Sequence, residues 1–296
     1  MQSVTEFEQE RLFEVPEAAV GPPKTTKPPV LVMDDEGHWS RAVSNHSAEK
    51  AYYVRRLAEI IGTGMRLKWP GKLWWIELFA GPGRLYLRET DAYVPGSPVE
   101  AVSVKHPFTG YVFADLDPRC VSSLSQRVER PGVHVLQGDA NSASLLDRVA
   151  SIVPRDALVV LYGDQEGLDL GWDTVKFLID RYPHLDLLLN LPVAGAVRAL
   201  AAGHDGKAGA MLGHEAPLDL VTRPALSRGA SLRDWYWRKL AAEGYDHINC
   251  VPIKLQGRNT DLYDLMLASR ASKALEFFDK ATSVGPKGQY ALSLPM

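Results

Sequence analysis

The sequence predicts an α/β fold in which a parallel sheet is covered by helices on both faces. Two observations carry this prediction. Short apolar runs recur between residues 73 and 191, and residues typical of helix starts and ends separate each run from the next. The runs are apolar at nearly every position, as are strands that are buried on both faces of a parallel sheet.

Length and composition exclude several classes of protein. The 296 residues, 46% hydrophobic and 23% charged, suit one large or two small globular domains with a full core. With only Cys120 and Cys250, the chain is neither a disulfide-rich secreted scaffold nor a protein with a multi-cysteine metal site. It has no run of about 18 apolar residues, and its acidic N-terminus lacks an apolar signal core. We therefore expect a cytoplasmic protein with no membrane partner.

The first 45 residues are predicted to form an N-terminal arm, and residues 46–296 a single domain. The stretch GPPKTTKPPV holds four prolines in ten residues, which favours extended backbone, and an acidic helix is expected around Glu6–Val15. The sequence leaves open whether the arm is disordered or straps the core. Eight acidic and four basic residues give the arm a net charge of −4, so the rest of the chain carries +1. That balance is not the global basic footprint of a nucleic-acid-binding protein, although it allows a local basic patch.

The domain is predicted to begin with a helix that leads into the first strand. Ser47 can cap a helix that runs through Ile61, and Gly62 lies just past its end. The apolar run that follows predicts a buried strand at Leu73–Phe79, which ends in a glycine-rich turn.

Helices and strands alternate from residue 97 to residue 192, and capping residues or prolines mark the helix boundaries. The predicted helices are 97–105, opened by Ser97 and Pro98; 117–130, opened by Asp117 and Pro118 and stopped by Pro131; 141–152, capped by Asn141; and Trp172–Arg181. The predicted strands are Tyr111–Ala114, VHVLQGDA ending at Asp139, ALVVLYGD and LDLLLNLP.

The alternation breaks at about residues 194–247, which are predicted to be a helical insertion. Ser231 with Asp234 three residues later forms a capping box for a helix that ends at Gly244. The runs HINCVPIKL and LYDLMLASR then predict two strands, with a helix at Ala274–Ala281 after them. We expect these two strands to form an antiparallel edge of the sheet.

The strongest chemical signal is the segment ELFAGPGR, which follows the first predicted strand. Gly81 and Gly83 would let the backbone approach a ligand closely, and Glu77 would brace the loop. A turn of this kind is weak evidence by itself. The third glycine of a dinucleotide fingerprint is missing, because Tyr86 stands at its position, which disfavours NAD.

Acidic residues end the next two predicted strands. Asp115 can accept both hydroxyls of a ribose, and Asp139 can accept from an adenine amino group. The alternative is that each caps the helix that follows, although Asp117 already suits that role near Asp115. Because open α/β sheets bind ligands at the carboxyl ends of their strands, these residues together fit S-adenosylmethionine (SAM) better than other common cofactors.

The segments ELFAGPGR, PGSPVEAV, YVFADLDP and LQGDA, in this order, resemble the three-Cys-motif partner (TcmP) proteins. HSAEK at 46–50 and LYDLMLASR at 262–270 are similar to that family's opening and closing segments, so the resemblance covers roughly residues 45–280. It implies a Rossmann-like class I SAM-dependent methyltransferase fold and partnership with a three-Cys-motif protein similar to radical enzymes. It also implies a cofactor site of Glu77, Phe79, Gly81, Gly83, Asp115, Asp139 and Ala140.

The sequence departs from the family pattern after the fourth strand. The family has Asp-Pro-Tyr-Gly, whereas this chain has Asp164-Gln165-Glu166-Gly167. In amino-methylating relatives the aromatic residue stacks on a flipped base, a contact worth about 1–3 kcal/mol. Its loss puts methylation of a base nitrogen in doubt. Glu166 would suit a general base or a cationic substrate, and the alternative is a decayed active site.

Asp164 and Asn190 end adjacent predicted strands, and with Glu166 they are the predicted catalytic residues. A carboxylate placed beside the acceptor can remove its proton, which contributes about 10²–10⁴-fold to a rate. Magnesium held by these oxygens is a less favoured alternative, so no metal is predicted.

Two further groups are candidates for function. A basic, aromatic segment, Arg223–Lys239, includes Trp235 and could contact nucleic acid phosphates or a protein partner, although a solvated helix with its tryptophans in the core is the simpler interpretation. His46 and Lys50, one helical turn apart, could line the mouth of the cofactor site. We expect a SAM-dependent methyltransferase of unknown acceptor (nucleic acid, a small metabolite or a partner-bound substrate). The alternatives are a non-catalytic SAM-binding or accessory subunit and, less favoured, NAD-linked redox chemistry.

Overall fold

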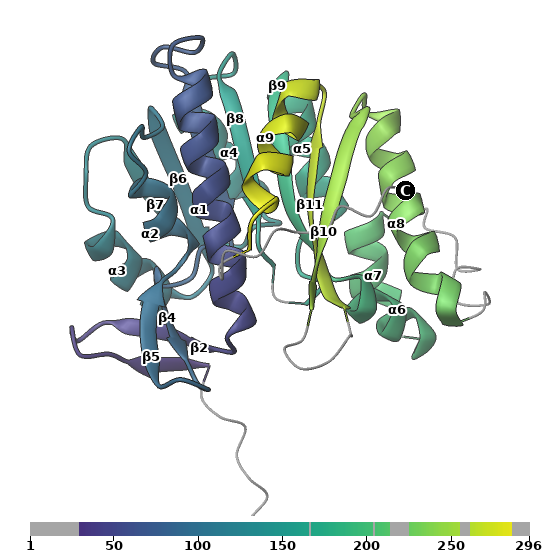
Figure 1. Cartoon of the computed structure of the whole chain (residues 1–296), viewed down its shortest axis with the longest axis horizontal. Helices are drawn as coiled ribbons and strands as arrows, with labels where there is room; N and C mark the ends of the chain where they lie inside the picture. Colours follow the sequence, from purple (N-terminus) through teal and green to yellow (C-terminus); the bar gives the residue numbers. More distant parts are fainter. Residues whose placement is uncertain (1–29, 166, 204, 214–224, 255–260, 286–296) are drawn as a thin grey trace, which may run out of the picture.

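The computed structural model describes residues 30–165, 167–203, 205–213, 225–254 and 261–285. Its centre is a seven-stranded sheet with the order β10-β11-β9-β8-β3-β6-β7 (Figure 1). The strands are β3 (Leu73–Leu78), β6 (Gly110–Asp115), β7 (Val133–Gln137), β8 (Leu158–Gly163), β9 (His184–Leu191), β10 (His247–Lys254) and β11 (Asp261–Ser269).

The strand directions confirm the predicted sheet. The five strands β3, β6, β7, β8 and β9 are parallel, β11 is antiparallel to β9, and β10 is antiparallel to β11. The chain runs from β3 outward through β6 to β7, and then returns to the other side of β3 with β8 and β9. The strand order therefore reverses between β3 and β8, and ligands bind at such a switch point in open α/β sheets. This order with an antiparallel edge is the Rossmann-like methyltransferase arrangement that the resemblance implies.

Helices cover both faces of the sheet because alternate side chains of its strands point to opposite sides. On β3, Trp74, Ile76 and Leu78 pack into one core, whereas Leu73 and Trp75 pack into the other. The first core is closed by α4 (Ala143–Ile152), α5 (Trp172–Arg181), α6 (Val193–Ala201), α7 (Asp205–Leu212) and α8 (Ala225–Ala242). The second is closed by α1 (His46–Met65), α2 (Ser97–Val102), α3 (Pro118–Arg127) and α9 (Ser272–Thr282).

A second, four-stranded sheet has no counterpart in the sequence prediction. Its order is β1-β2-β4-β5, from β1 (Leu31–Met33), β2 (Trp39–Val43), β4 (Arg84–Leu87) and β5 (Ala92–Pro95). It lies at the lower left of Figure 1, beside the lower end of α1. Residues 31–43 of the predicted arm therefore form strands, whereas Glu6–Val15 lies outside the described residues.

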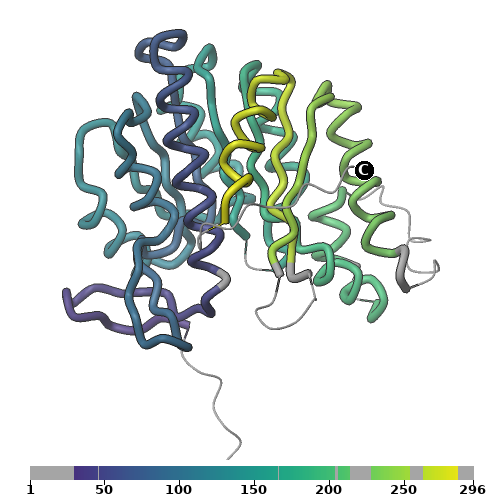
Figure 2. Tube along the Cα trace, in the orientation of Figure 1, coloured from purple at the N-terminus to yellow at the C-terminus, as the bar shows by residue number. Residues whose placement is uncertain are grey.

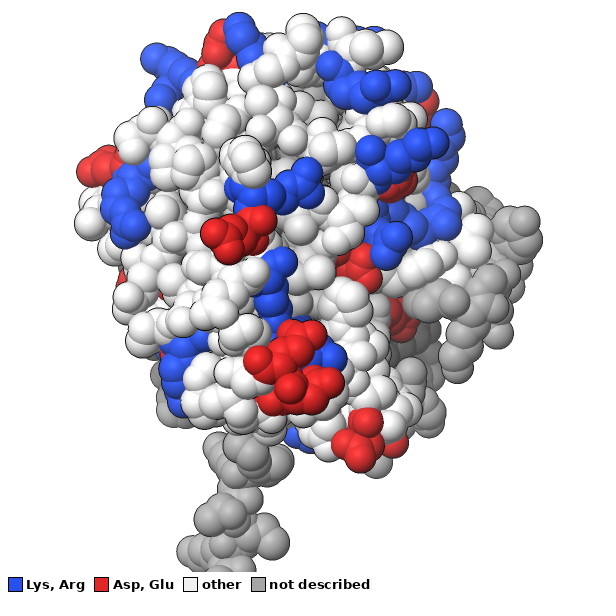
Figure 3. Space-filling model, turned by 90° about the vertical axis from the view of Figure 1, so that its left-hand side faces the viewer, with Lys and Arg blue, Asp and Glu red and all other residues white. Residues whose placement is uncertain are grey.

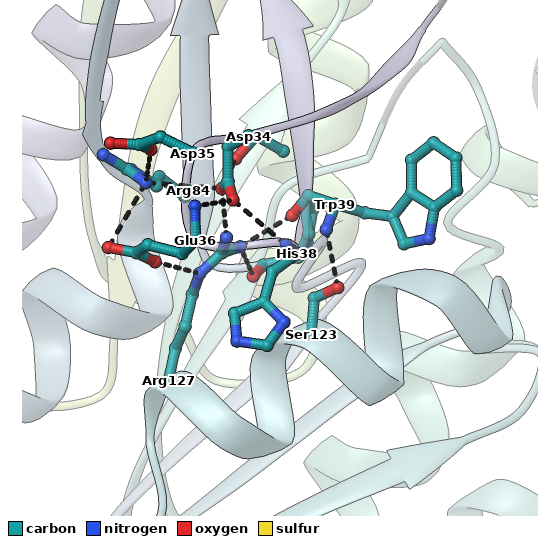
Figure 4. A network of polar contacts seen from close by, with 10 residues as sticks. Asp34, Asp35, Glu36, His38, Trp39, Arg84, Ser123 and Arg127 are labelled. Carbon is teal, nitrogen blue, oxygen red and sulfur yellow. Dashed lines mark hydrogen bonds and ion pairs between the residues drawn. The ribbon is translucent and has the colours of Figure 1, made fainter.

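A buried polar network joins this small sheet to the glycine-rich turn (Figure 4). Arg127 of α3 forms an ion pair with Asp34, in the turn between β1 and β2, and only 8% of the Arg127 side chain is exposed. The same guanidinium donates hydrogen bonds to the carbonyls of Trp39 and Pro82, both at 2.7 Å. Arg127 of α3 thus links the turn at Gly81–Gly83 to the N-terminal hairpin.

Three predicted helices have wrong boundaries. The first helix continues past Gly62 to Met65. A Cβ at Gly62 would lie 2.1 Å from the His106 carbonyl oxygen. The glycine therefore permits close packing inside the helix, and Ser47 lies within the first turn rather than capping it. Ser142 caps α4 through a bond from the Leu145 N–H, in place of Asn141.

The third error lies in the insertion, where α8 begins at Ala225 and so contains Ser231, the predicted cap. The remaining element predictions agree with the structure to within a few residues, and α5 matches at both ends. In the trace of Figure 2, α6, α7 and α8 lie together beside the antiparallel edge of the large sheet. In the described part of the chain, no helix combines the length and apolar character needed to cross a membrane.

Candidate active site

A cavity of about 1370 Å³ opens at the carboxyl ends of the parallel strands. It is lined by eight of the ten predicted site residues, namely Phe79, Gly81, Gly83, Asp115, Asp139, Ala140, Asp164 and Asn190. Glu77 does not line it, and Glu166 lies outside the described residues. We name its two parts after the roles predicted from the sequence, and the part at the ends of β3, β6 and β7 is the cofactor half. The part at the ends of β8 and β9 is the acceptor half.

The glycine-rich turn after β3 has a backbone that few side chains tolerate. Gly81 and Gly83 have φ angles of 66° and 83°, and even Phe79 has a positive φ of 66°. A Cβ at Gly83 would lie 2.8 Å from Leu124 Cδ1. The turn therefore needs glycine both for its conformation and for its packing against α3.

Asp115 ties this turn to the end of β6. Its Oδ2 accepts a hydrogen bond of 2.8 Å from the Gly81 N–H, and its Oδ1 accepts one of 2.9 Å from the Asp117 N–H. Asp117 caps α3 as predicted, which leaves Asp115 without a capping role. Each carboxylate oxygen has two acceptor sites, so Asp115 retains the capacity to accept from a diol.

Asp139 lies beyond the end of β7, in the same row of strand ends. Its Oδ1 accepts 2.9 Å from the Asn141 N–H, while Ser142 caps the helix that follows. The exposed Asp139 and the buried Ala140 both line the cavity. Asn141 is held elsewhere, because its Oδ1 accepts from the Gly171 N–H at 2.8 Å.

Glu77 is completely buried beneath the cavity. Its Oε1 accepts a short bond of 2.5 Å from Ser97 Oγ, and its Oε2 accepts one of 3.3 Å from the Trp75 indole N–H. Burial raises the pKa of Glu77 to about 8, against the lowering effect of the Ser97 hydrogen bond. Ser97 itself lines the cavity, so Glu77 positions a lining residue but does not line the cavity.

The acceptor half is built from side chains that bond to one another. Asp164, after β8, forms an ion pair with Lys50 of α1 and accepts 3.1 Å from Asn190 Nδ2. The Gln165 side chain donates to the Asn190 carbonyl at 3.3 Å and accepts from the Leu170 N–H at 2.7 Å. The structure thus brings the predicted pair Asp164 and Asn190 together. It places Lys50, a candidate for the mouth of the cofactor site, against Asp164 in the acceptor half.

Tyr263 of β11 completes this half and was not predicted. The Lys50 ammonium lies 5.2 Å from the centre of the Tyr263 ring, and burial raises the pKa of the Tyr263 hydroxyl to about 12. Its position in the segment LYDLMLASR was the only signal in the sequence, because β11 lies about a hundred residues from β8 along the chain. Among the described residues, no cluster of three or more His, Cys, Asp or Glu side chains is arranged to hold a metal ion.

The basic segment that begins at Arg223 is largely engaged within the fold where it is described. Arg233 forms an ion pair with the buried Asp264, and the Lys239 ammonium lies 4.4 Å from the Trp172 ring centre. Arg238 pairs with Asp234 on the surface, where 75% of its side chain is exposed. Arg223 lies outside the described residues.

The surface shows no single dominant charge on the face drawn in Figure 3. Basic and acidic side chains are interspersed there, in keeping with the near-zero net charge of residues 46–296. At the cavity itself, Arg119 pairs with Asp117 and Lys207 pairs with Asp169. The charges at the cavity rim therefore largely offset one another.

No family model matches the chain, and no curated protein sequence matches it. Solved structures show distant similarity. An O-methyltransferase from Bacillus cereus in complex with S-adenosylhomocysteine (SAH) is 11% identical, with a TM-score of 0.42, and the match covers 72% of this chain and 80% of that chain. The N-methyltransferase NodS from Bradyrhizobium japonicum is also 11% identical, with a TM-score of 0.39 and coverage of 76% and 97%.

Spermidine synthase from Thermotoga maritima is 8% identical, with a TM-score of 0.46 and coverage of 88% of this chain and 72% of that chain. Similarity at this level carries no argument about activity, so the strand order and the antiparallel edge decide the fold. On that basis the chain has the Rossmann-like fold of the SAM-dependent methyltransferases, with an additional four-stranded sheet beside the cavity.

Proposed function

We propose that the protein is a SAM-dependent methyltransferase that binds its cofactor in the large cavity. The observation that carries this proposal is the row of strand ends in the cofactor half. The glycine turn, Asp115 and Asp139 follow three neighbouring strands and line one cavity next to the switch point. A nucleoside laid along that row would meet backbone at the turn, a carboxylate at the ribose and a second carboxylate at the base.

The residues present fit the cofactor. The glycine turn allows the backbone to approach it, Asp115 would accept from the ribose hydroxyls, and Asp139 would accept from the adenine amino group. Glu77 would keep Ser97 in place. When bound, SAM supplies an electrophilic methyl group, and the task of the chain's own residues is to hold the acceptor in line with it. In the acceptor half, Asp164 is placed to accept a proton and Asn190 to orient the Asp164 carboxylate.

We further propose that the chain is a TcmP family member and acts with a three-Cys-motif protein. The quoted motifs support this proposal because they occur in one order over most of the domain. The acceptor would then be a nucleic acid, a small metabolite or a substrate presented by the partner. The Arg223–Lys239 segment stays a candidate contact, with Arg238 as its most exposed described cation.

Calorimetric titration with SAM, SAH and NAD tests the cofactor proposal. We expect micromolar binding of SAM and SAH and none of NAD, because the dinucleotide fingerprint lacks its third glycine. Binding of NAD alone, or of none of the three both with and without a three-Cys-motif partner, would refute the proposal.

An accessory role is the second candidate function, and the Lys50–Asp164 ion pair favours it. That pair engages the carboxylate that a catalytic base would need, and Gln165 anchors backbone where the family has proline. An accessory subunit would bind SAH yet leave the methyl transfer rate of its partner unchanged when Asp164 is replaced by Asn. A methyltransferase would lose most of its rate in the same Asp164→Asn variant.

A further inference from the structure

The Lys50 ammonium occupies a site of defined chemistry in the acceptor half. It touches the Asp164 carboxylate on one side, and the Tyr263 ring lies 5.2 Å away on another. Asn190 holds the carboxylate in place with its amide N–H. A carboxylate and an aromatic face are the two groups that proteins combine to bind an alkyl ammonium.

This ammonium site belongs to the cavity. Lys50, Asp164, Asn190 and Tyr263 all line it. The side chains of Lys50 and Asp164 are 13% and 16% exposed, so solvent reaches the pair from the cavity. The site also lies at the ends of β8 and β9, next to the row that would hold the cofactor, which is where a methyl acceptor must reach the methyl group.

We propose that the methyl acceptor is a primary alkyl amine that takes the place of Lys50 against Asp164 and Tyr263. This inference rests on the proposed function and names the substrate class of the same site. The Lys50 ammonium then occupies the position that the substrate ammonium would take. It neutralises Asp164 until an amine with further contacts in the cavity displaces it. Lys50 and the substrate compete for the ammonium site. Because Lys50 is attached to the chain, its ammonium has a high effective concentration there.

The chemistry of the site suits an amine. The bound ammonium must lose a proton before its nitrogen lone pair can form the new bond to the methyl carbon. The Asp164 carboxylate is positioned to accept that proton. As the N–C bond forms, the C–S bond of the sulfonium breaks and its electron pair stays on sulfur. The products are therefore the N-methylammonium ion, SAH and one proton, which leaves from Asp164 to solvent through the cavity.

The test uses Lys50→Met, which removes the ammonium and keeps an unbranched side chain of the length of the lysine stem. We expect this variant to be less stable than the native protein, because Asp164 loses its counter-ion. The probe is n-butylammonium, which has the same four-carbon stem as lysine. It should raise the melting temperature of Lys50→Met and bind it, in calorimetry without cofactor, at least tenfold more tightly than it binds the native protein.

Three controls test whether the response depends on the charge of the amine and on the ammonium site. n-Butanol matches the probe in shape without its charge and should have no effect. The double variant Lys50→Met/Asp164→Asn lacks both charges and should not respond to the amine. Lys207→Met removes a cavity lysine that pairs with Asp169 instead, and it should behave as the native protein does.

Several results would overturn the proposal. These are equal amine affinity in the native and Lys50→Met proteins, a response to n-butanol as large as to the amine, or a Lys50→Met protein that fails to fold even with the amine. A tenfold loss of SAH affinity in Lys50→Met would also overturn it, because Lys50 would then contribute to cofactor binding.

With SAM present, Lys50→Met should produce N-methylbutylamine, detected by mass spectrometry. If the variant binds both the amine and SAM but forms no product, the proposed acceptor class is refuted. Failure of the native protein to bind SAM would refute the proposed function separately.

Discussion

In the cofactor half of the cavity the carboxylates bond to backbone N–H groups of neighbouring turns, whereas in the acceptor half the side chains bond to one another. Asp115 accepts from Gly81 and Asp117, and Asp139 accepts from Asn141 two residues away. Asp164, in contrast, is held by Lys50 from 114 residues away and by Asn190 from the next strand. The carboxylates of one half are therefore fixed mainly by backbone N–H groups, and the carboxylate of the other by side chains of distant elements.

The difference has a consequence for function. A turn that carries its own hydrogen bonds is organised before a ligand arrives, so little conformational entropy is lost on binding. A set of paired side chains can exchange one partner for another when a ligand offers the same charge. Under the proposed function, the cofactor half would hold a constant ligand, and the acceptor half a substrate that displaces an internal group.

The largest expected effect tests how far the cofactor half depends on the small sheet. Arg127→Met would remove the closer of the two cations that pair with the buried Asp34 carboxylate and leave Arg84, 3.4 Å away, as the other. The cost therefore stays below the value for a fully broken buried pair, which is about 3–5 kcal/mol. It would also remove the donor to the Pro82 carbonyl. We expect a lower free energy of unfolding, measured by urea denaturation, together with weaker SAH binding.

Arg130→Met is the matched control, because Arg130 lies just after α3 and donates to the Val102 carbonyl of α2, away from the glycine turn. It should leave SAH affinity unchanged. If Arg127→Met binds SAH as the native protein does, the glycine turn does not depend on its link to the hairpin. The two halves would then differ more in their dependence on distant elements than the structure indicates.

The next effect concerns the pH dependence of stability through Glu77. Its pKa is raised to about 8 in the folded protein, from a usual value of 4.5, because it is buried. Between these values the unfolded chain loses the Glu77 proton while the folded chain keeps it, so stability is fully present below pH 4.5 and falls as pH rises to about 8. The slope is up to about 1.4 kcal/mol per pH unit.

Glu77→Gln cannot ionise and should lack this decline. The measurement is the free energy of unfolding of both proteins from pH 5 to pH 8. Parallel curves would mean that Glu77 is ionised in the folded protein.

A smaller effect separates the two halves directly. Asp115→Ala should weaken SAM binding at least tenfold, about 1.4 kcal/mol, because the ribose loses its acceptor and Gly81 loses its tether. Asn190→Leu, in the acceptor half, should change SAM affinity less than threefold. Calorimetry of both variants decides the matter, and equal losses would show that the halves do not act independently.

The smallest effect lies outside both halves, on α8. Arg238→Ala removes an exposed ion pair and should change stability by less than about 0.5 kcal/mol. If the Arg223–Lys239 segment contacts nucleic acid, affinity for a fluorescent RNA oligonucleotide will fall steeply with salt, and this variant will lower the salt slope by about one. An affinity for the oligonucleotide that does not change with salt would mean that α8 has a structural role only.

The parts of the fold that the sequence predicted well are those with a strong local pattern. Asp117 before Pro118 predicted the start of α3, because a cap and an N-terminal proline act within one turn. Strands β4 and β5 were missed, because each has four mostly half-buried residues and β4 pairs with residues about forty positions earlier. Asn141 was misassigned as a cap because Gly171, thirty residues away, takes its side-chain oxygen.

The sequence by itself determined the succession of strands and helices along the chain, the glycine turn and the acids at three strand ends, because these depend on local periodicity and on turns of a few residues. Only the tertiary structure decided what the acids face. The pairing of Asp164 with Lys50, the Tyr263 ring beside it and the Arg127 tether to Pro82 join elements far apart in the chain. Such contacts form only when the whole sheet and its helices are packed, since no local preference favours one distant partner over another.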